Sequence, residues 1–178
     1  MQIKKLFKEP REYGVMNGEM NNNDIIRQGP ILVAADFSDN SRTAVIWALN
    51  LAKALGPSVI LVHVVHDRAD GPGYYRHDKK DAMRPMEDVA EKMMKDFLVS
   101  LGKKISQYES FKNLKTEIVT GLPVTRILEM ADRVNACMII MGSQGLTGLA
   151  HLLIGSKAEQ VVRMAKIPVT IVKEPVKS

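Results

Sequence analysis

The glycines between residues 142 and 156 are the part of the sequence best suited to chemistry. Gly142, Gly145, Gly155 and Ser156 form the pattern G-x2-G-x9-G-S between an apolar run and a helical pattern. Glycine has no Cβ, so backbone N–H groups can approach an anion and φ can become positive. A helix beginning at Ser156 would add unpaired N–H groups and a positive dipole end. The segment therefore predicts an anion-binding loop, although a tight turn followed by a helix start would leave the same pattern.

A carboxylate at the end of another predicted strand is the second candidate. Asp36 closes the apolar run that begins at Ile31. In an open parallel sheet, ligands bind beyond the carboxyl ends of the strands, where the strand order reverses. The glycine-rich loop should reach the same edge, so Asp36 could meet whatever that loop holds. Alternatively, Asp36 is a solvated carboxylate near the start of the next helix.

Familiar catalytic and metal-binding motifs do not appear. The loop has neither the G-x-x-x-x-G-K-[ST] nor the G-x-G-x-x-G spacing, and there is no G-x-S-x-G elbow, H-E-x-x-H pair or kinase signature set. His63 and His66 are three residues apart on a predicted strand, so they should project to opposite faces. A metal site built by the protein is therefore not expected.

The elements that must position these residues follow an alternating order from Pro30 onward. Strand-length apolar runs alternate with longer helical patterns, which is typical of βαβ units around a parallel sheet. Five strands are predicted, at residues 31–36, 58–65, 114–120, 137–142 and 168–173. Four helices are predicted to start at Ser38–Ser41, at Pro85, at Pro123 and, with capping-box spacing, at Ser156. We predict one α/β domain at 30–174, an N-terminal extension at 1–29 and a tail at 175–178.

Composition and charge limit the partners and the compartment. The chain of 178 residues has one cysteine, so no internal disulfide can form, and a lone thiol suits a reducing, cytoplasmic location. No apolar run approaches the roughly 20 residues of a membrane helix, so no membrane association is expected. The net charge is +5, but the basic residues are spread beside acidic ones. We therefore expect no nucleic-acid partner.

From residue 30 to 174 the sequence resembles a universal stress protein of the ATP-binding subgroup. The subgroup's hallmark, G-x2-G-x9-G-[ST], is matched in full. The similarity extends to the segments at 31–38, 59–64, 121–123 and 167–172. The resemblance implies a three-layer α/β fold of the adenine nucleotide alpha hydrolase type. Its open, twisted five-stranded parallel sheet would have the order 3-2-1-4-5, with helices on both faces.

The resemblance also implies roles for residues on the first three strands. Ala34, Ala35, Asp36 and Val64 would surround the adenine and ribose, with Asp36 against the ribose hydroxyls. Gly121, after the third strand, would line the pocket or simply make a turn. Where this sequence has Ala34 and Ala35, the family frequently has proline or glycine and then threonine or valine. The sequence therefore departs from the family beside the adenine.

The glycine-rich loop supplies the other residues that the resemblance places around the nucleotide. Met141 and Gly142 would lie against it. The phosphates would accept hydrogen bonds from N–H groups or a hydroxyl of three residues, Gly145, Gly155 and Ser156. Lys157 stands where the family often has an apolar or small residue, and it could add a cation near the triphosphate or remain in solvent. The expected ligand is ATP, or ADP or AMP, with Mg²⁺ held through the phosphates and water.

The function implied by the resemblance is nucleotide-dependent regulation in a stress response. Such proteins form homodimers, commonly through the last strand, here the edge at 169–172. Nucleotide would order residues 143–154 and alter a surface recognised by an unnamed partner protein. Two alternatives stay open, a slow ATP hydrolase or phosphotransferase and a nucleotide-free interaction module. Because no general base beside the γ-phosphate is evident, at most slow hydrolysis is expected.

Overall fold

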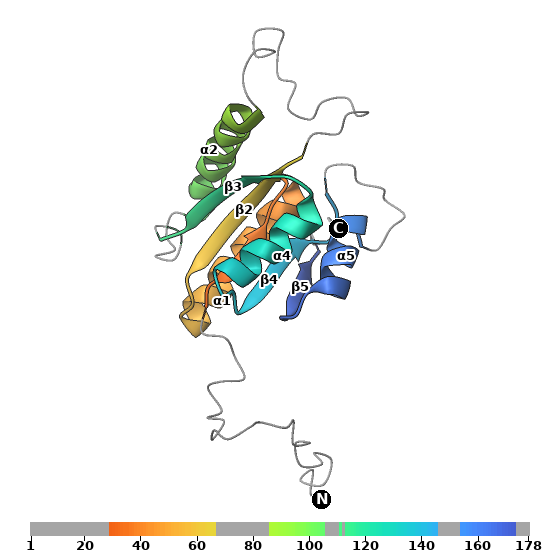
Figure 1. Ribbon diagram of the computed structural model, residues 1–178. Coiled ribbons are helices and arrows are strands. Elements are labelled where there is room, and N and C mark those ends of the chain that lie inside the picture. The colour runs from red at the N-terminus through yellow and green to blue at the C-terminus, as the bar shows by residue number, and fades with distance from the viewer. Residues whose placement is uncertain (1–28, 67–85, 106–110, 112, 146–153, 174–178) are drawn as a thin grey trace, which may run out of the picture.

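The computed structural model describes residues 29–66, 86–105, 111, 113–145 and 154–173 (Figure 1). Several expectations fall outside these ranges. They concern the N-terminal extension up to residue 28, nearly all of the polar loop predicted at 66–84, the helix start at Pro85, the middle of the glycine-rich loop at 146–153 and the C-terminal tail. Among the described helices, none is long and apolar enough to cross a membrane.

The sheet has five parallel strands in the order β3-β2-β1-β4-β5, which confirms the expected topology. The strand bounds are β1 Ile31–Ala34, β2 Val59–Val65, β3 Lys115–Thr120, β4 Met138–Gly142 and β5 Val169–Val172. In the register, Ile31 is paired with Val59 on one side and Met138 on the other, so β1 is the middle strand. The first strand was predicted to reach Asp36 but ends at Ala34, because the chain turns at Phe37 with φ 67°.

The helices are α1 Asp39–Leu55, α2 Met86–Ile105, α4 Pro123–Arg133 and α5 Ser156–Met164. Two predicted start signals are confirmed: the Ser38 hydroxyl accepts from the N–H of Ser41 at 3.2 Å, and Pro123 is the first residue of α4. The capping-box prediction at Ser156 is wrong. The helix does begin at Ser156, but Gly155 is the N-cap, and it makes no side-chain cap because glycine has no side chain. Its carbonyl accepts the first helical bond, from Glu159 N–H at 3.0 Å.

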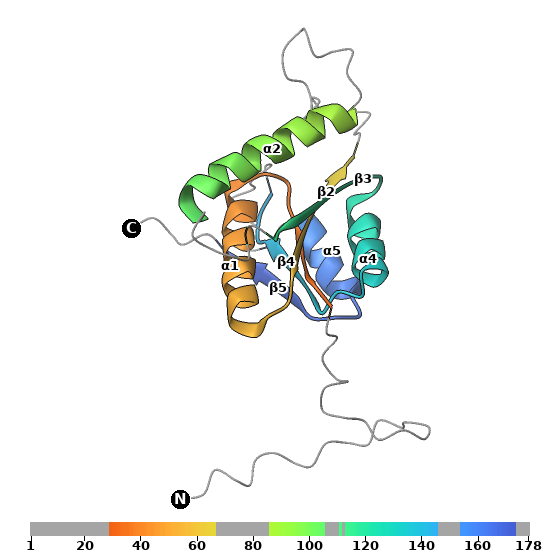
Figure 2. The ribbon, with the colours of Figure 1, turned by 90° about the vertical axis from the view of Figure 1, so that its left-hand side faces the viewer.

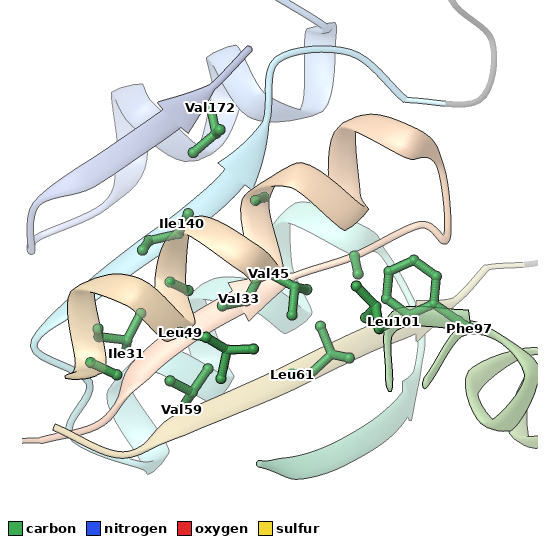
Figure 3. Close-up of a cluster of buried hydrophobic side chains, with 14 of the residues drawn as sticks. Ile31, Val33, Val45, Leu49, Val59, Leu61, Phe97, Leu101, Ile140 and Val172 are labelled. Atoms are coloured by element: carbon green, nitrogen blue, oxygen red, sulfur yellow. The ribbon is translucent and has the colours of Figure 1, made fainter. Parts of the chain in front are cut away.

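Helices cover both faces of the sheet, with α1 and α2 on one side and α4 and α5 on the other (Figure 2). Along β1 the side chains alternate, so Val33 faces the buried cluster that also contains Leu49 of α1 and Phe97 of α2 (Figure 3). Leu32 faces the other way, into a cluster with Ile127 of α4. Each such side chain stabilises the fold by about 1.5–3 kcal/mol on burial. The two apolar layers thus hold the carboxyl ends of the strands in fixed positions.

Candidate functional site

The strand order reverses between β1 and β4, and two residues that are distant in the sequence meet there. The chain leaves β1 toward β2 on one side, whereas β4 lies on the other side of β1. After β4, the loop passes beside Asp36: a Cβ built on Gly145 would stand 2.5 Å from Oδ2 of that carboxylate. No side chain fits in that space without displacing Asp36, so Gly145 provides bare backbone at the reversal point.

Hydrogen bonds fix the direction of the Asp36 carboxylate. Its Oδ1 accepts from the Ser41 hydroxyl at 2.6 Å and from the Ser38 N–H at 3.1 Å. The N–H of Asp36 donates to the same Ser41 hydroxyl at 3.0 Å, and Ser38 and Ser41 are buried. These bonds fix Oδ1 at the start of α1. The carboxylate is therefore held in place, with Oδ2 on the side of Gly145.

The described part of the glycine-rich loop is closed by two backbone hydrogen bonds. The N–H of Gly155 donates to the Ser143 carbonyl at 2.7 Å, so the two ends of the loop meet. The Ser143 N–H in turn donates to the Val172 carbonyl at 2.8 Å, which ties the loop to β5. The first turn of α5 thereby lies beside Gly145, whose nitrogen is 4.0 Å from a Cβ built on Gly155. The loop and the N-terminus of α5 therefore meet at one place. A helix N-terminus suits an anion, although the N–H groups of Ser143 and Gly155 are already donated within the protein.

Gly142 has a different role from Gly145 and Gly155. A Cβ there would stand 2.8 Å from the carbonyl carbon and from the Cβ of Asn40, in the first turn of α1. The helix backbone cannot move aside as a flexible side chain can. Gly142 is thus required for α1 to pack against β4, and the path of the loop depends on that packing.

The remaining predicted residues occupy three places in the fold. Ala34 and Met141 are register partners on β1 and β4, and with Val64 of β2 they belong to the cluster on the α4–α5 face. Ala35, by contrast, packs in the cluster on the α1–α2 face. At the third place, the start of α5, two residues are exposed, Ser156 and Lys157. These positions flank the meeting point of Asp36 and Gly145.

Gly121 lies farther away, after the edge strand β3. Its φ of 140° suits glycine, and its N–H donates to the Val65 carbonyl at 2.9 Å. A Cβ there would meet Nε of Arg126 at 2.7 Å. Because β2 stands between β3 and β1, the fold does not bring Gly121 next to Asp36. Of its two expected roles, the structure supports the turn that leads into α4.

His63 is the neighbour of the site that the sequence analysis misjudged. It was considered there only as a metal ligand, yet it is buried on β2 and its Nδ1 lies 2.8 Å from the carbonyl oxygen of Ala35. Burial lowers the pKa of His63, although its bond to Ala35 and the nearby charge of Asp36 act to raise that pKa. A single polar residue within the apolar run Val59–Val65 was the signal available in the sequence. Within the described residues, no group of three or more His, Cys, Asp or Glu side chains could hold a metal ion.

Known proteins share this architecture. The model of the universal stress protein family matches residues 29–173. The universal stress protein MJ0531 of Methanocaldococcus jannaschii is 32% identical over 160 residues, which cover 87% of this chain and 91% of that protein. The archaeal relative and the family match therefore span the whole sheet and both ends of the glycine-rich loop.

Two solved structures are similar to this chain in sequence and in fold. MJ0577 of Methanocaldococcus jannaschii has a TM-score of 0.62 and 25% identity, and the alignment covers 85% of this chain and 100% of that one. A universal stress protein in complex with cAMP has a TM-score of 0.52 and 25% identity, with 81% and 95% of the two chains covered. The sheet order and its helical layers are thus shared with proteins of this kind.

Proposed function

The chain belongs to the universal stress protein family, and from that premise we propose that it binds ATP, or another adenine nucleotide, where β1 and β4 end. One observation carries the proposal: the fixed carboxylate of Asp36 faces the backbone of Gly145 at the point where the strand order reverses. A nucleotide offers hydroxyls that donate to a carboxylate and phosphates that accept from N–H groups. A nucleotide can therefore bind both the Asp36 carboxylate and the backbone N–H groups near Gly145.

In the proposed complex, Asp36 accepts hydrogen bonds from the ribose hydroxyls. Ala34 and Val64, at the ends of β1 and β2 on the α4–α5 face, pack against the adenine. Ala35 can reach it only through its backbone, because its side chain lies on the α1–α2 face. On the phosphate side, contacts come from the end of β4, the loop and the start of α5: Met141, Gly142, Gly145, Gly155 and Ser156. Lys157, exposed on the first turn of α5, is close enough in sequence to add a cation. Mg²⁺ would enter with the phosphates and keep most of its water ligands.

The relatives support an adenine nucleotide over other anions. One of the two solved structures described above is a universal stress protein in complex with cAMP, a ligand that combines adenine, ribose and phosphate. That chain aligns with 81% of this one, so its nucleotide-bearing fold is shared almost throughout. An inorganic anion alone would leave the carboxylate of Asp36 facing a like charge, which is unfavourable.

The proposed role is nucleotide-dependent regulation by a cytoplasmic homodimer. The edge strand β5 has one partner strand, β4, within the sheet. Residues Val169–Ile171 are only half-buried, so a second copy could cover this edge. Because the Ser143 N–H is tied to β5, a nucleotide that moves the loop would also act on that edge. A partner protein could bind the nucleotide-bound dimer and the nucleotide-free dimer with different affinities.

The test uses purified protein and measures two quantities, the nucleotide that the protein retains and its affinity for added ATP. Bound nucleotide is released by denaturation and identified, and ATP with and without Mg²⁺ is then titrated into stripped protein by calorimetry. We expect released adenine nucleotide or a saturable heat of ATP binding. Phosphate production in the same samples separates a binding protein from an ATP hydrolase. An absence of both retained nucleotide and ATP binding would favour an interaction module whose pocket stays empty.

A further inference from the structure

His63 is a polar side chain inside an apolar strand, and it contacts the residues on both sides of Asp36. Only 3% of its surface is exposed, and its Nδ1 lies 2.8 Å from the carbonyl oxygen of Ala35. A carbonyl oxygen can only accept, so Nδ1 must carry the hydrogen and donate. Burial lowers the pKa of His63 and keeps the ring neutral. The ring is therefore held as one tautomer, with its hydrogen bond directed at the chain just before Asp36.

This hydrogen bond continues the sheet beyond the last residue of β1. The N–H of Ala35 still donates to the backbone carbonyl of Val62 at 2.9 Å, as in a further step of the β1–β2 ladder. The carbonyl of Ala35 is satisfied by the side chain of His63 instead of by backbone. Both polar groups of the Ala35 residue are thus tied to β2, and the peptide that leads into Asp36 is fixed.

The residue after Asp36 is held by the same ring. Phe37 has φ 67°, a conformation that costs a bulky residue free energy and persists only where the surroundings enforce it. Its ring stacks on His63 with centroids 4.2 Å apart and an interplanar angle of 27°. On α2, Phe97 adds a tilted contact at 5.5 Å. His63 therefore holds the chain on both sides of Asp36, by a hydrogen bond before it and by stacking after it.

We propose that His63 is a positioning residue of the nucleotide site, which fixes the Ala35–Phe37 turn so that the Asp36 carboxylate faces Gly145. It thereby sets how strongly the protein recognises ribose hydroxyls. The inference rests on the proposed function, because it needs a nucleotide whose ribose reaches Asp36. A histidine that served only the core would affect stability and leave ribose recognition unchanged.

The experiment compares the affinities for ATP and for 2′,3′-dideoxyATP, which lacks both ribose hydroxyls. His63→Phe keeps an aromatic ring against Phe37 but removes the donor to Ala35. His63→Asn places an amide N–H near the position of Nδ1. Calorimetry is carried out well below the melting temperature of every variant. We expect the wild-type preference for ATP to fall about tenfold in His63→Phe, as the loss of a well-aligned charged hydrogen bond requires, and to be largely retained in His63→Asn.

Val65→Ala is the matched control, because Val65 is a fully buried residue of the same strand. We expect it to lower the melting temperature and leave the preference for ATP over the dideoxy analogue unchanged. If His63→Phe does not fold, the comparison of His63→Asn with His63→Gln carries the test. The longer glutamine cannot place its N–H at Nδ1, so it should lose the preference that asparagine keeps.

The outcomes separate this inference from the proposed function. A preference for ATP that stays within twofold of wild type in His63→Phe and His63→Gln would overturn the positioning role and leave nucleotide binding intact. Wild-type protein that binds ATP and the dideoxy analogue equally well would also overturn it, since Asp36 would then not recognise ribose. Wild-type protein that binds neither nucleotide would remove the proposed function and this inference together.

Discussion

Gly145 lies so close to Asp36 that a Cβ on the glycine would stand 2.5 Å from Oδ2 of the carboxylate. The two residues are separated by more than half of the chain, and they meet because β1 and β4 are neighbouring strands. A ligand held by the loop would therefore contact the carboxylate as well. The following predictions test this relationship and its surroundings.

Gly145→Val should abolish ATP binding while the domain stays folded. The valine side chain would displace the Asp36 carboxylate and cover backbone N–H groups at the same time. We expect at least a tenfold loss of ATP affinity by calorimetry, with an unchanged far-ultraviolet circular dichroism spectrum. Ser58→Val, at an exposed position beyond the opposite end of the sheet, is the control and should bind as wild type does. Full affinity in Gly145→Val would exclude the loop from the site.

Asp36→Asn should weaken ribose recognition with little change in volume. A hydrogen bond to a charged group contributes about 1.5–3 kcal/mol, so the affinity for ATP should fall roughly 10- to 100-fold. The affinity for 2′,3′-dideoxyATP should change much less, because that analogue has no hydroxyl for the carboxylate. An equal loss for both nucleotides would indicate that Asp36 acts on the loop and not on the ribose.

Ser41→Ala should destabilise the fold through the turn that carries Asp36. The buried hydroxyl donates to the carboxylate at 2.6 Å and accepts from the Asp36 N–H at 3.0 Å. Removing it leaves a part-buried donor without this acceptor, which costs about 1–3 kcal/mol of unfolding free energy. Urea denaturation measures the change. Thr43→Ala, which loses an exposed helix hydrogen bond to the Asp39 carbonyl, should cost clearly less.

Ile171→Pro should dissociate the proposed dimer. The Pro168 carbonyl accepts from Ile139 of β4, and the Val172 carbonyl accepts from Ser143 just after β4. By strand alternation, the N–H of Ile171 therefore points away from β4. Proline removes that outward donor and blocks strand pairing with a second copy. Sedimentation velocity should show a monomer for Ile171→Pro and a dimer for Ile171→Ala, which loses the side chain but keeps the N–H. A dimer in both variants would place the interface elsewhere.

The neutral His63 ring should make stability depend on pH. Burial lowers the folded-state pKa of His63 below its ordinary value of 6.5, so the unfolded chain binds this proton more readily. The contribution of the neutral ring to the unfolding free energy is complete above the ordinary pKa of 6.5. It is lost as the pH falls from 6.5 toward the lowered folded-state pKa. We expect the unfolding free energy to fall as the pH drops below about 6.5, with a smaller fall in His63→Asn. Equal slopes in both proteins would contradict a neutral buried ring.

Some features could be predicted because they depend on neighbours in the chain. The alternation of apolar runs and helical patterns gave the correct elements, and the Ser38 cap and Pro123 start were confirmed for the same reason. The start of α5 at Ser156 was also predicted correctly, but its cap was not. Gly155 is the N-cap, and its N–H donates to the distant Ser143 carbonyl, a contact about which local residue preferences carry no information.

The sequence by itself determined the periodicity, the breakers and the glycine spacing, since each of these acts through residues a few positions apart. Only the tertiary structure decided that Asp36 faces Gly145, and that Gly142 is required for the packing of α1. It also decided that the ring of His63 holds the turn around Asp36. These contacts join strands and loops that are far apart in the chain, and they arise because burial of the apolar faces fixes which strands are neighbours.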